Sequence, residues 1–158
     1  MSIVRNNSQN LFRKAFFHFL LLCLVTYSPG SLAAENDLAG RVVAVRGQVS
    51  AIGGDGVSRP LQRRGQIFVG DTIVTQPSGF AQVRMTDEAL VALKENTRFE
   101  IVEYVYEEAQ NDISTLRLIE GGFRTITGAI GESNRDAYNV ETEYATIGIR
   151  GTDHEVVI

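Results

Sequence analysis

The sequence predicts an all-β fold, arranged as a single domain of about ten to twelve short strands. Three observations lead to this prediction. Several windows alternate apolar and polar residues with the period of two that suits a strand buried on one face. Glycine and other turn-forming residues separate these windows at spacings of about ten residues. No window of useful length repeats apolar residues every three to four positions, as an amphipathic helix requires.

The first strands are expected at 41–46 and 48–52. They form either one long strand bent at Gly47 or a hairpin. Residues 60–71 are expected to be a loop with apolar anchors. The strands expected after that loop are 72–75, 80–85, 90–93, 98–106, 113–119 and 123–126. The alternation in 80–85 places Ala81, Val83 and Met85 on one face and Gln82 and Arg84 on the other.

The strand at 98–106 has a regular period of two. This period places Phe99, Ile101 and Val105 on one face and Tyr104 on the other. The first three should therefore point into the core, and Tyr104 should lie on the wetter side of the sheet.

The last part of the chain alternates loops and short strands. Residues 107–112 are polar and predict a hairpin loop. Residues 128–136 form a passage rich in glycine and polar residues that precedes the closing strands. The closing segment 138–158 predicts two short strands around the Arg-Gly-Thr turn at 150–152.

Residues 1–33 are expected to be a signal peptide, and residues 38–158 the folded domain. The run at 15–25 is apolar for about eleven residues, shorter than the roughly 20 that span a bilayer. No acidic residue occurs before Glu35, and the basic residues of this segment are Arg5, Arg13 and Lys14. Cleavage after Ala33 would leave a chain without cysteine, so disulfides, thiol catalysis and thiolate metal sites are excluded from it.

Two alternatives to a cleaved signal peptide are disfavoured. A membrane anchor conflicts with the short apolar run and with His18 inside it. Lipid attachment at Cys23 conflicts with Leu22, because a small residue is needed before a lipidated cysteine. We therefore expect export to the periplasm or the cell surface, with no stable membrane anchor in the mature chain.

The charge of the mature chain disfavours anionic polymers as partners. From residue 34 onward, 12 Lys and Arg residues stand against 19 Asp and Glu residues, a net charge of −7. A protein with this net charge repels nucleic acid unless its basic residues cluster. From residue 34 onward, only Arg63 and Arg64 are adjacent basic residues. We expect no nucleic-acid partner. Eleven of the 12 bases are arginine, which suits carboxylate ladders and protein contacts.

Taken in order, several segments resemble the FecR-type domain of bacteria. The resemblance begins with the valine-rich strand at 42–49 and ends with Ala-x-x-Gly-Ile-Arg-Gly-Thr inside 145–156. The steps between them are Gly-Asp-Thr-Ile-Val-Thr at 70–75, Ser-Gly-Phe-Ala and its strand at 78–87, an apolar return at 89–93, Asn-Thr-Arg-Phe-Glu-Ile at 96–101, and Leu-Ile-Glu-Gly-Gly at 118–122.

The resemblance implies an exported all-β module that meets another protein. It also implies a solenoid-like roll of short strands, with a sandwich as the alternative. The best-known relatives are transmembrane anti-sigma regulators, whose sigma-binding segment and membrane helix are not recognised here, so that role is not carried over. His154 stands where the family usually has an aromatic residue. The candidate structural or interaction residues are Gly70, Asp71, Asp87, Asn96, Gly121, Arg150, Gly151 and Thr152.

Each residue that suggests a chemical role also has a purely structural interpretation. Arg150 could clamp a carboxylate, or Gly151 could simply supply a backbone angle that other residues resist. Asp153 beside His154 could suggest part of a hydrolytic triad. The sequence has no Gly-x-Ser-x-Gly motif, and the mature chain has no second histidine, so a hydrolytic site is disfavoured. The acids at 103–112 have no calcium-loop spacing and favour a solvated hairpin tip. We expect no catalytic, metal or cofactor site, and no enzyme.

The expected function is a non-catalytic FecR-like module for protein interaction or signal sensing in the periplasm or at the cell surface, with another envelope protein as its partner. Two alternatives stay open. One is a cell-wall or polysaccharide-acting enzyme that uses acidic residues. The other is the front of a longer surface protein, because the sequence stops inside an expected strand at Ile158.

Overall fold

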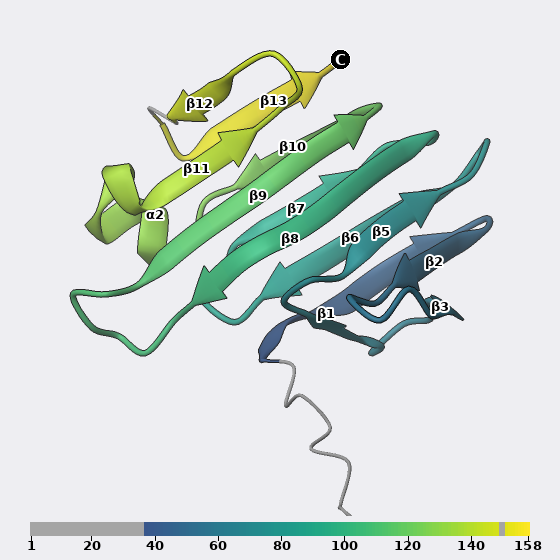
Figure 1. Cartoon of the computed structure of the whole chain (residues 1–158), viewed down its shortest axis with the longest axis horizontal. Helices are drawn as coiled ribbons and strands as arrows, with labels where there is room; N and C mark the ends of the chain where they lie inside the picture. Colours follow the sequence, from purple (N-terminus) through teal and green to yellow (C-terminus); the bar gives the residue numbers. More distant parts are fainter. Residues whose placement is uncertain (1–36, 149–150) are drawn as a thin grey trace, which may run out of the picture. The chain divides into compact units, whose positions relative to one another are not determined.

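The computed structural model describes residues 37–148 and 151–158, and the all-β prediction is confirmed. Within these described residues, thirteen strands form two open sheets that enclose one apolar core. In Figure 1 sheet B lies in front of sheet A. In spatial order, sheet A consists of β13 (Asp153–Val157), β10 (Gly122–Ile126), β7 (Leu90–Leu93), β6 (Phe80–Met85), β1 (Leu38–Arg46) and β4 (Gln66–Phe68). Sheet B consists of β12 (Thr146–Gly148), β11 (Tyr138–Glu141), β9 (Ile113–Glu120), β8 (Thr97–Val105), β5 (Thr72–Thr75), β2 (Val49–Ile52) and β3 (Ser58–Pro60).

The chain passes from one sheet to the other and back while it advances from β1 and β2 towards β12 and β13 (Figure 1). At Gly47 the structure shows neither a hairpin nor one long strand: β1 ends at Arg46, β2 begins at Val49, and the two belong to different sheets and do not pair. Gly47 has φ +67°, and a Cβ there would lie 2.8 Å from the carbonyl oxygen of Ser78. A side chain is therefore resisted both by backbone angle and by space.

All neighbouring strands are antiparallel except β9 and β11, which are parallel. A parallel pair needs a long connection, and this one contains β10, the helix α2 (Ala129–Ser133) and the 3₁₀ helix η1 (Arg135–Ala137). Both helices lie in or overlap the glycine-rich and polar passage at 128–136, where the sequence pattern did not indicate a helix. A helix of five residues is too short to show a helical repeat in sequence, although its Ile130 is fully buried.

The expected loop at 60–71 also contains regular structure. Pro60 ends β3, and residues 66–68 form β4. Each of these strands has three residues and pairs with one neighbour, β3 with β2 and β4 with β1. Three residues are too few to display an alternating pattern, which is why this expectation was wrong.

The predicted facing of β6 is confirmed, since Ala81, Val83 and Met85 are all buried. The predicted facing of β8 was wrong beyond Ile101. Ile101 pairs with Leu116, but Glu103 pairs with the next residue, Thr115, so Val102 is an extra residue. This β-bulge reverses the alternation and turns Tyr104 into the core with 4% of its surface exposed.

No helix within the described part of the chain is long and apolar enough to cross a membrane. The expected signal peptide and its cleavage site lie outside the described residues.

Candidate functional site

The eight motif residues expected from the sequence lie mostly at separate turns. Gly70 and Asp71 precede β5, Asp87 lies between β6 and β7, and Thr152 precedes β13. The structure brings two of the eight, Asn96 and Gly121, into direct contact. Arg150 lies outside the described residues.

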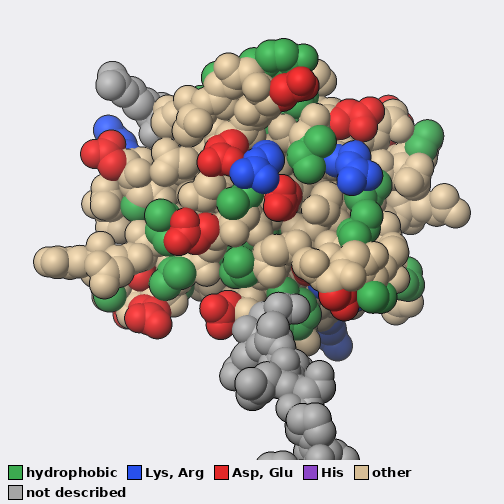
Figure 2. Space-filling view, in the orientation of Figure 1, with side chains coloured by type: hydrophobic (Ala, Val, Ile, Leu, Met, Phe, Trp, Pro, Cys, Tyr) green, Lys and Arg blue, Asp and Glu red, His purple; other side chains and the backbone are tan. Residues whose placement is uncertain are grey.

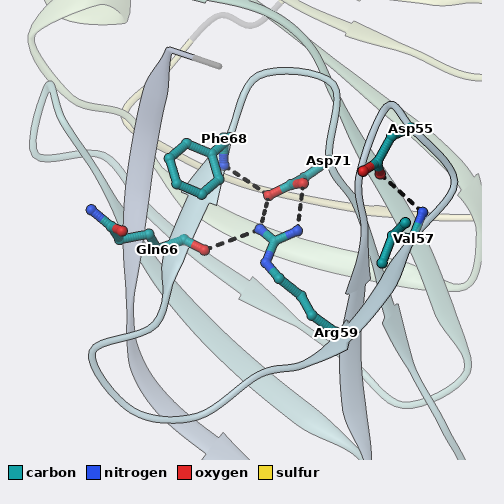
Figure 3. Close-up of polar contacts among 6 residues, drawn as sticks. All are labelled: Asp55, Val57, Arg59, Gln66, Phe68 and Asp71. Carbon is teal, nitrogen blue, oxygen red and sulfur yellow. Dashed lines mark hydrogen bonds and ion pairs between the residues drawn. The ribbon is translucent and has the colours of Figure 1, made fainter. Parts of the chain in front are cut away.

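Asp71 is buried, with 1% of its surface exposed, and holds the short strands β3 and β4 together. Arg59 of β3 donates from Nη1 to Asp71 Oδ1 at 2.9 Å and from Nη2 to Oδ2. The amide of Phe68 donates to Oδ2 at 2.8 Å, and the carbonyl of Gln66 accepts from Arg59 at 3.2 Å. Figure 3 shows these groups around the guanidinium, which also lies 5.5 Å from the centre of the Phe68 ring. The carboxyl of Asp71 raises the pKa of Arg59.

This ion pair joins the last strands of the two sheets, because β3 belongs to sheet B and β4 to sheet A. Backbone hydrogen bonds next to this ion pair attach the same turn to β8. The amide of Gly70 donates to the carbonyl of Ile101 at 2.8 Å, and the amide of Ile101 donates to the carbonyl of Asp71 at 3.0 Å. Gly70 has φ +84°, which favours glycine. The Gly-Asp step therefore links the two sheets at the end formed by β3 and β4.

Asp87 is also buried and accepts hydrogen bonds from three parts of the chain. The phenol of Tyr104 donates to Oδ1, the amide of Ala89 donates to Oδ1 at 3.0 Å, and the amide of Ile130 donates to Oδ2 at 3.2 Å. A Cβ at Gly128 would lie 2.3 Å from the carbonyl oxygen of Asp87, so only glycine allows α2 to sit this close. Burial, with the nearby Asp87, raises the pKa of Tyr104.

Asn96 and Gly121 lie where the chain crosses between the sheets, and both have positive φ, +53° and +86°. A Cβ on Gly121 would lie 2.4 Å from the Asn96 carbonyl oxygen and 2.7 Å from Thr97 Cα. The buried hydroxyl of Thr97 donates to the carbonyl of Gly122 at 3.0 Å and accepts from its amide at 3.1 Å. These residues hold β8 of sheet B against β10 of sheet A.

Gly151 and Thr152 are exposed. Gly151 has φ +133°, and the carbonyl of Thr152 accepts from the amide of Thr127 at 2.8 Å. This bond extends the pairing of β10 with β13 by one step.

His154, on β13, packs into the core from the edge of sheet A. Its ring meets Phe123 and Tyr138 edge-on, with centroid distances of 6.1 Å and 5.7 Å. Both ring nitrogens are buried and have no hydrogen-bond partner within residues 37–148 and 151–158. Burial lowers the pKa of His154. The imidazole thus takes an aromatic position in the core.

Three residues that organise these turns were not found from the sequence. They are Arg59, Tyr104 and Gly128. Tyr104 had a detectable signal, because Ile101-Val102 places two apolar residues in succession where a bulge can occur. The roles of Arg59 and Gly128 depend on contacts between segments that are distant in the sequence, and no local sequence pattern indicates such contacts.

The outer face of sheet B carries a ladder of charges across its strands. Arg117 of β9 lies between Glu100 of β8, at 2.8 Å, and Glu141 of β11, at 2.7 Å. Figure 2 shows this face, with acidic and basic side chains next to one another and acidic ones more widespread. These side chains are partly exposed, and ion pairs that solvent screens in this way add little stability, so the ladder chiefly keeps the face polar.

The acidic hairpin between β8 and β9 is organised by Asp112. Its Oδ1 accepts from the amide of Glu107 at 2.8 Å, and its Oδ2 accepts from the amide of Ala109 at 3.2 Å. Both carboxylate oxygens of Asp112 therefore stabilise this hairpin turn.

Among the described residues, β13 is the longest of the four strands that lie at a sheet edge. β13 pairs with β10 on one side and is the last strand of the sheet. Its two acids are paired, Asp153 with Arg124 and Glu155 with Lys94. Large apolar residues are exposed beside it: Ile126, Val157 and Ile158.

The family comparison bears on this same region. The model of the family described as FecR protein matches residues 71–157, from the buried Asp71 to the end of β13. The chain belongs to the FecR family. FecR proteins form a regulatory and signalling family of the cell envelope. Seven of the eight candidate motif residues of this FecR domain, all except Gly70, lie inside the matched range.

One solved structure, described as a cell surface anchoring domain, is 24% identical to this FecR chain. The similarity covers 39% of this chain and 82% of that chain with a TM-score of 0.38, and we base no argument on it. A search of curated proteins finds no match.

Proposed function

We propose that this FecR domain is a non-catalytic interaction module, exported to the periplasm or the cell surface, that binds another envelope protein by strand addition to β13. One observation carries the proposal. The amide of Ile158 donates to Gly121 and the amide of Thr127 donates to Thr152, so β13 residues with even numbers bond to β10. In an antiparallel pair the intervening residues then direct their backbone groups outward. Those residues are Asp153, Glu155 and Val157.

The other sheet edges are less suited to receive a strand. β3, β4 and β12 have three residues each, and β3 ends in Pro60. Short length and proline are the usual means of blocking an edge. β13 has five residues, and its acids are already neutralised by partners on β10 and beside β7. An added strand would gain backbone hydrogen bonds and apolar contact with Ile126 and Val157.

Export is the second part of the proposal. It rests on the basic and apolar pattern of residues 1–33, with the folded domain at 38–158. Expression of the whole chain with fractionation checks it: we expect periplasmic protein whose N-terminus is Ala34. Retention of uncleaved chain in the cytosol would contradict export.

The edge is tested by substituting Val157→Pro, which removes one outward amide and leaves the bonds to β10 in place. Val157→Ala is the matched control, because it reduces the apolar contact but keeps the amide. Each chain is used to recover partners from native envelope extracts, and far-ultraviolet circular dichroism verifies folding. We expect recovery with wild type and Val157→Ala and loss with Val157→Pro. Equal recovery by a folded Val157→Pro chain would overturn strand addition.

A further inference from the structure

A groove of about 380 Å³ lies on the outer face of sheet A, over β1 and β6. Its apolar floor includes Leu38 and Val43, and four arginines surround it: Arg41, Arg63, Arg64 and Arg84. The bases are distant in the sequence, apart from Arg63 and Arg64, and the fold gathers them. The one acidic residue of the lining is Glu88.

Two of these arginines are placed against electrostatic preference. Arg41 of β1 and Arg84 of β6 are directly opposite each other in the strand register. Like charges in that position destabilise a sheet. Glu88 lies 3.3 Å from Arg84, whereas no ion pair within residues 37–148 and 151–158 involves Arg41, Arg63 or Arg64. The groove therefore keeps three guanidinium groups available to an anion.

The loop that supplies Arg63 and Arg64 is fixed against β1. The amide of Arg64 donates to the carbonyl of Val42 at 2.7 Å, and the amide of Val42 donates to the carbonyl of Gly65 at 2.9 Å. Arg64 has φ +71°, a left-handed conformation that is costly for a residue with a side chain. Backbone strain that is retained by surrounding bonds is frequent at binding sites.

We propose that this arginine groove binds an acidic peptide segment of the partner protein. The guanidinium fork matches a carboxylate with two parallel hydrogen bonds, and the apolar floor accepts an aliphatic side chain between acids. This inference rests on the proposed function, because it names the chemistry of a partner that the domain recognises.

A membrane surface would offer the same negative charge, but the rest of the molecule disfavours it. Residues 37–158 carry 18 Asp and Glu against 12 Lys and Arg. A broad anionic surface would meet those acids, whereas a short peptide contacts the groove alone, because charges more than about 8 Å apart are largely screened from each other at physiological salt. The acidic peptide is therefore favoured over anionic lipid.

The test is a selection of random displayed nonapeptides on the folded mature chain, followed by titration of the best peptide. Arg41→Gln/Arg63→Gln is the groove variant. Arg98→Gln/Arg135→Gln is the matched control, because both residues are exposed, lie outside the groove and change the net charge equally. We expect selected peptides rich in Asp and Glu. Their Kd should weaken about tenfold or more in the groove variant and stay nearly unchanged in the control, with weaker binding at high salt.

Three outcomes would overturn the inference: no enrichment of acidic residues, equal weakening in both variants, or binding to phosphatidylglycerol vesicles without binding to peptides. The last would assign the groove to a membrane surface. The Val157→Pro chain separates the two proposals. If acidic peptides do not bind the groove while partner recovery still depends on Val157, strand addition is supported and the groove proposal is not. If acidic peptides bind while no envelope protein is recovered, strand addition fails and the groove remains.

Discussion

The phenol of Tyr104 donates a hydrogen bond to the buried carboxyl group of Asp87, and this bond joins a strand of sheet B to a turn of sheet A. It exists because the bulge at Val102 turns Tyr104 inward. Tyr104→Phe removes the donor and leaves a buried acceptor with fewer partners. We expect a loss of about 1–2 kcal/mol in the free energy of unfolding, measured by urea titration. Tyr144→Phe, at a residue that is 79% exposed, is the control and should change nothing measurable.

Gly121→Ala should be far more destabilising than Gly56→Ala. The two glycines have similar φ, +86° and +79°, but only Gly121 faces backbone atoms where a Cβ would lie. The cost at Gly56 is that of the left-handed conformation, about 1 kcal/mol. At Gly121 overpacking is added, and we expect about 3 kcal/mol or more in thermal or urea unfolding. Similar losses at the two positions would show that the crossing tolerates a methyl group.

Arg59 and Asp71 should be coupled in a double-mutant cycle. Asp71→Ala removes the buried acceptor of both Arg59 and the Phe68 amide, and we expect a loss of about 2–3 kcal/mol. Arg59→Ala should cost less, since its side chain is 35% exposed and solvent screens it. We expect a coupling energy of about 1 kcal/mol in the free energy of unfolding. Additive losses would mean that the pair does not tie β3 to β4.

Stability should fall on mild acidification because of His154. Burial lowers the pKa of this imidazole from its ordinary value of 6.5, so in the interval below 6.5 the unfolded chain binds a proton that the folded chain does not. The contribution is fully present above that interval and is lost as pH falls through it. His154→Phe should flatten the dependence of the unfolding midpoint on pH between about 7 and 5 relative to wild type. Parallel curves for the two chains would contradict this assignment.

Much of the fold could be predicted from local patterns, and the failures have physical causes. β6 was placed with its correct face because Ala81, Val83 and Met85 form an uninterrupted alternation. β8 was misassigned after Ile101 because a bulge is set by pairing with β9 rather than by β8 alone. The helix α2, with five residues, and the strands β3 and β4, with three residues each, are too short for a repeating pattern to be recognised.

The candidate site was less predictable than the fold. Asp71 and Asp87 could be singled out through the family resemblance, but their partners Arg59 and Tyr104 could not, because those contacts close over long sequence separations. The arginine groove was missed for the same reason. Counted along the chain the bases look dispersed, and only the register of β1 with β6 brings Arg41 opposite Arg84.

The order of strands has a consequence for the design of variants. After β4 the chain adds its strands towards one end of both sheets, whereas β3 and β4 lie outside β2 and β1 at the other end. Such an architecture approaches a one-dimensional stack, in which damage spreads mainly to adjacent layers. Removing the final layer should expose β10 and β11 as new borders while β1 to β8 keep their arrangement. The chain can therefore be shortened or extended at the end formed by β12 and β13. A segment fused there would find an existing strand edge with which to pair.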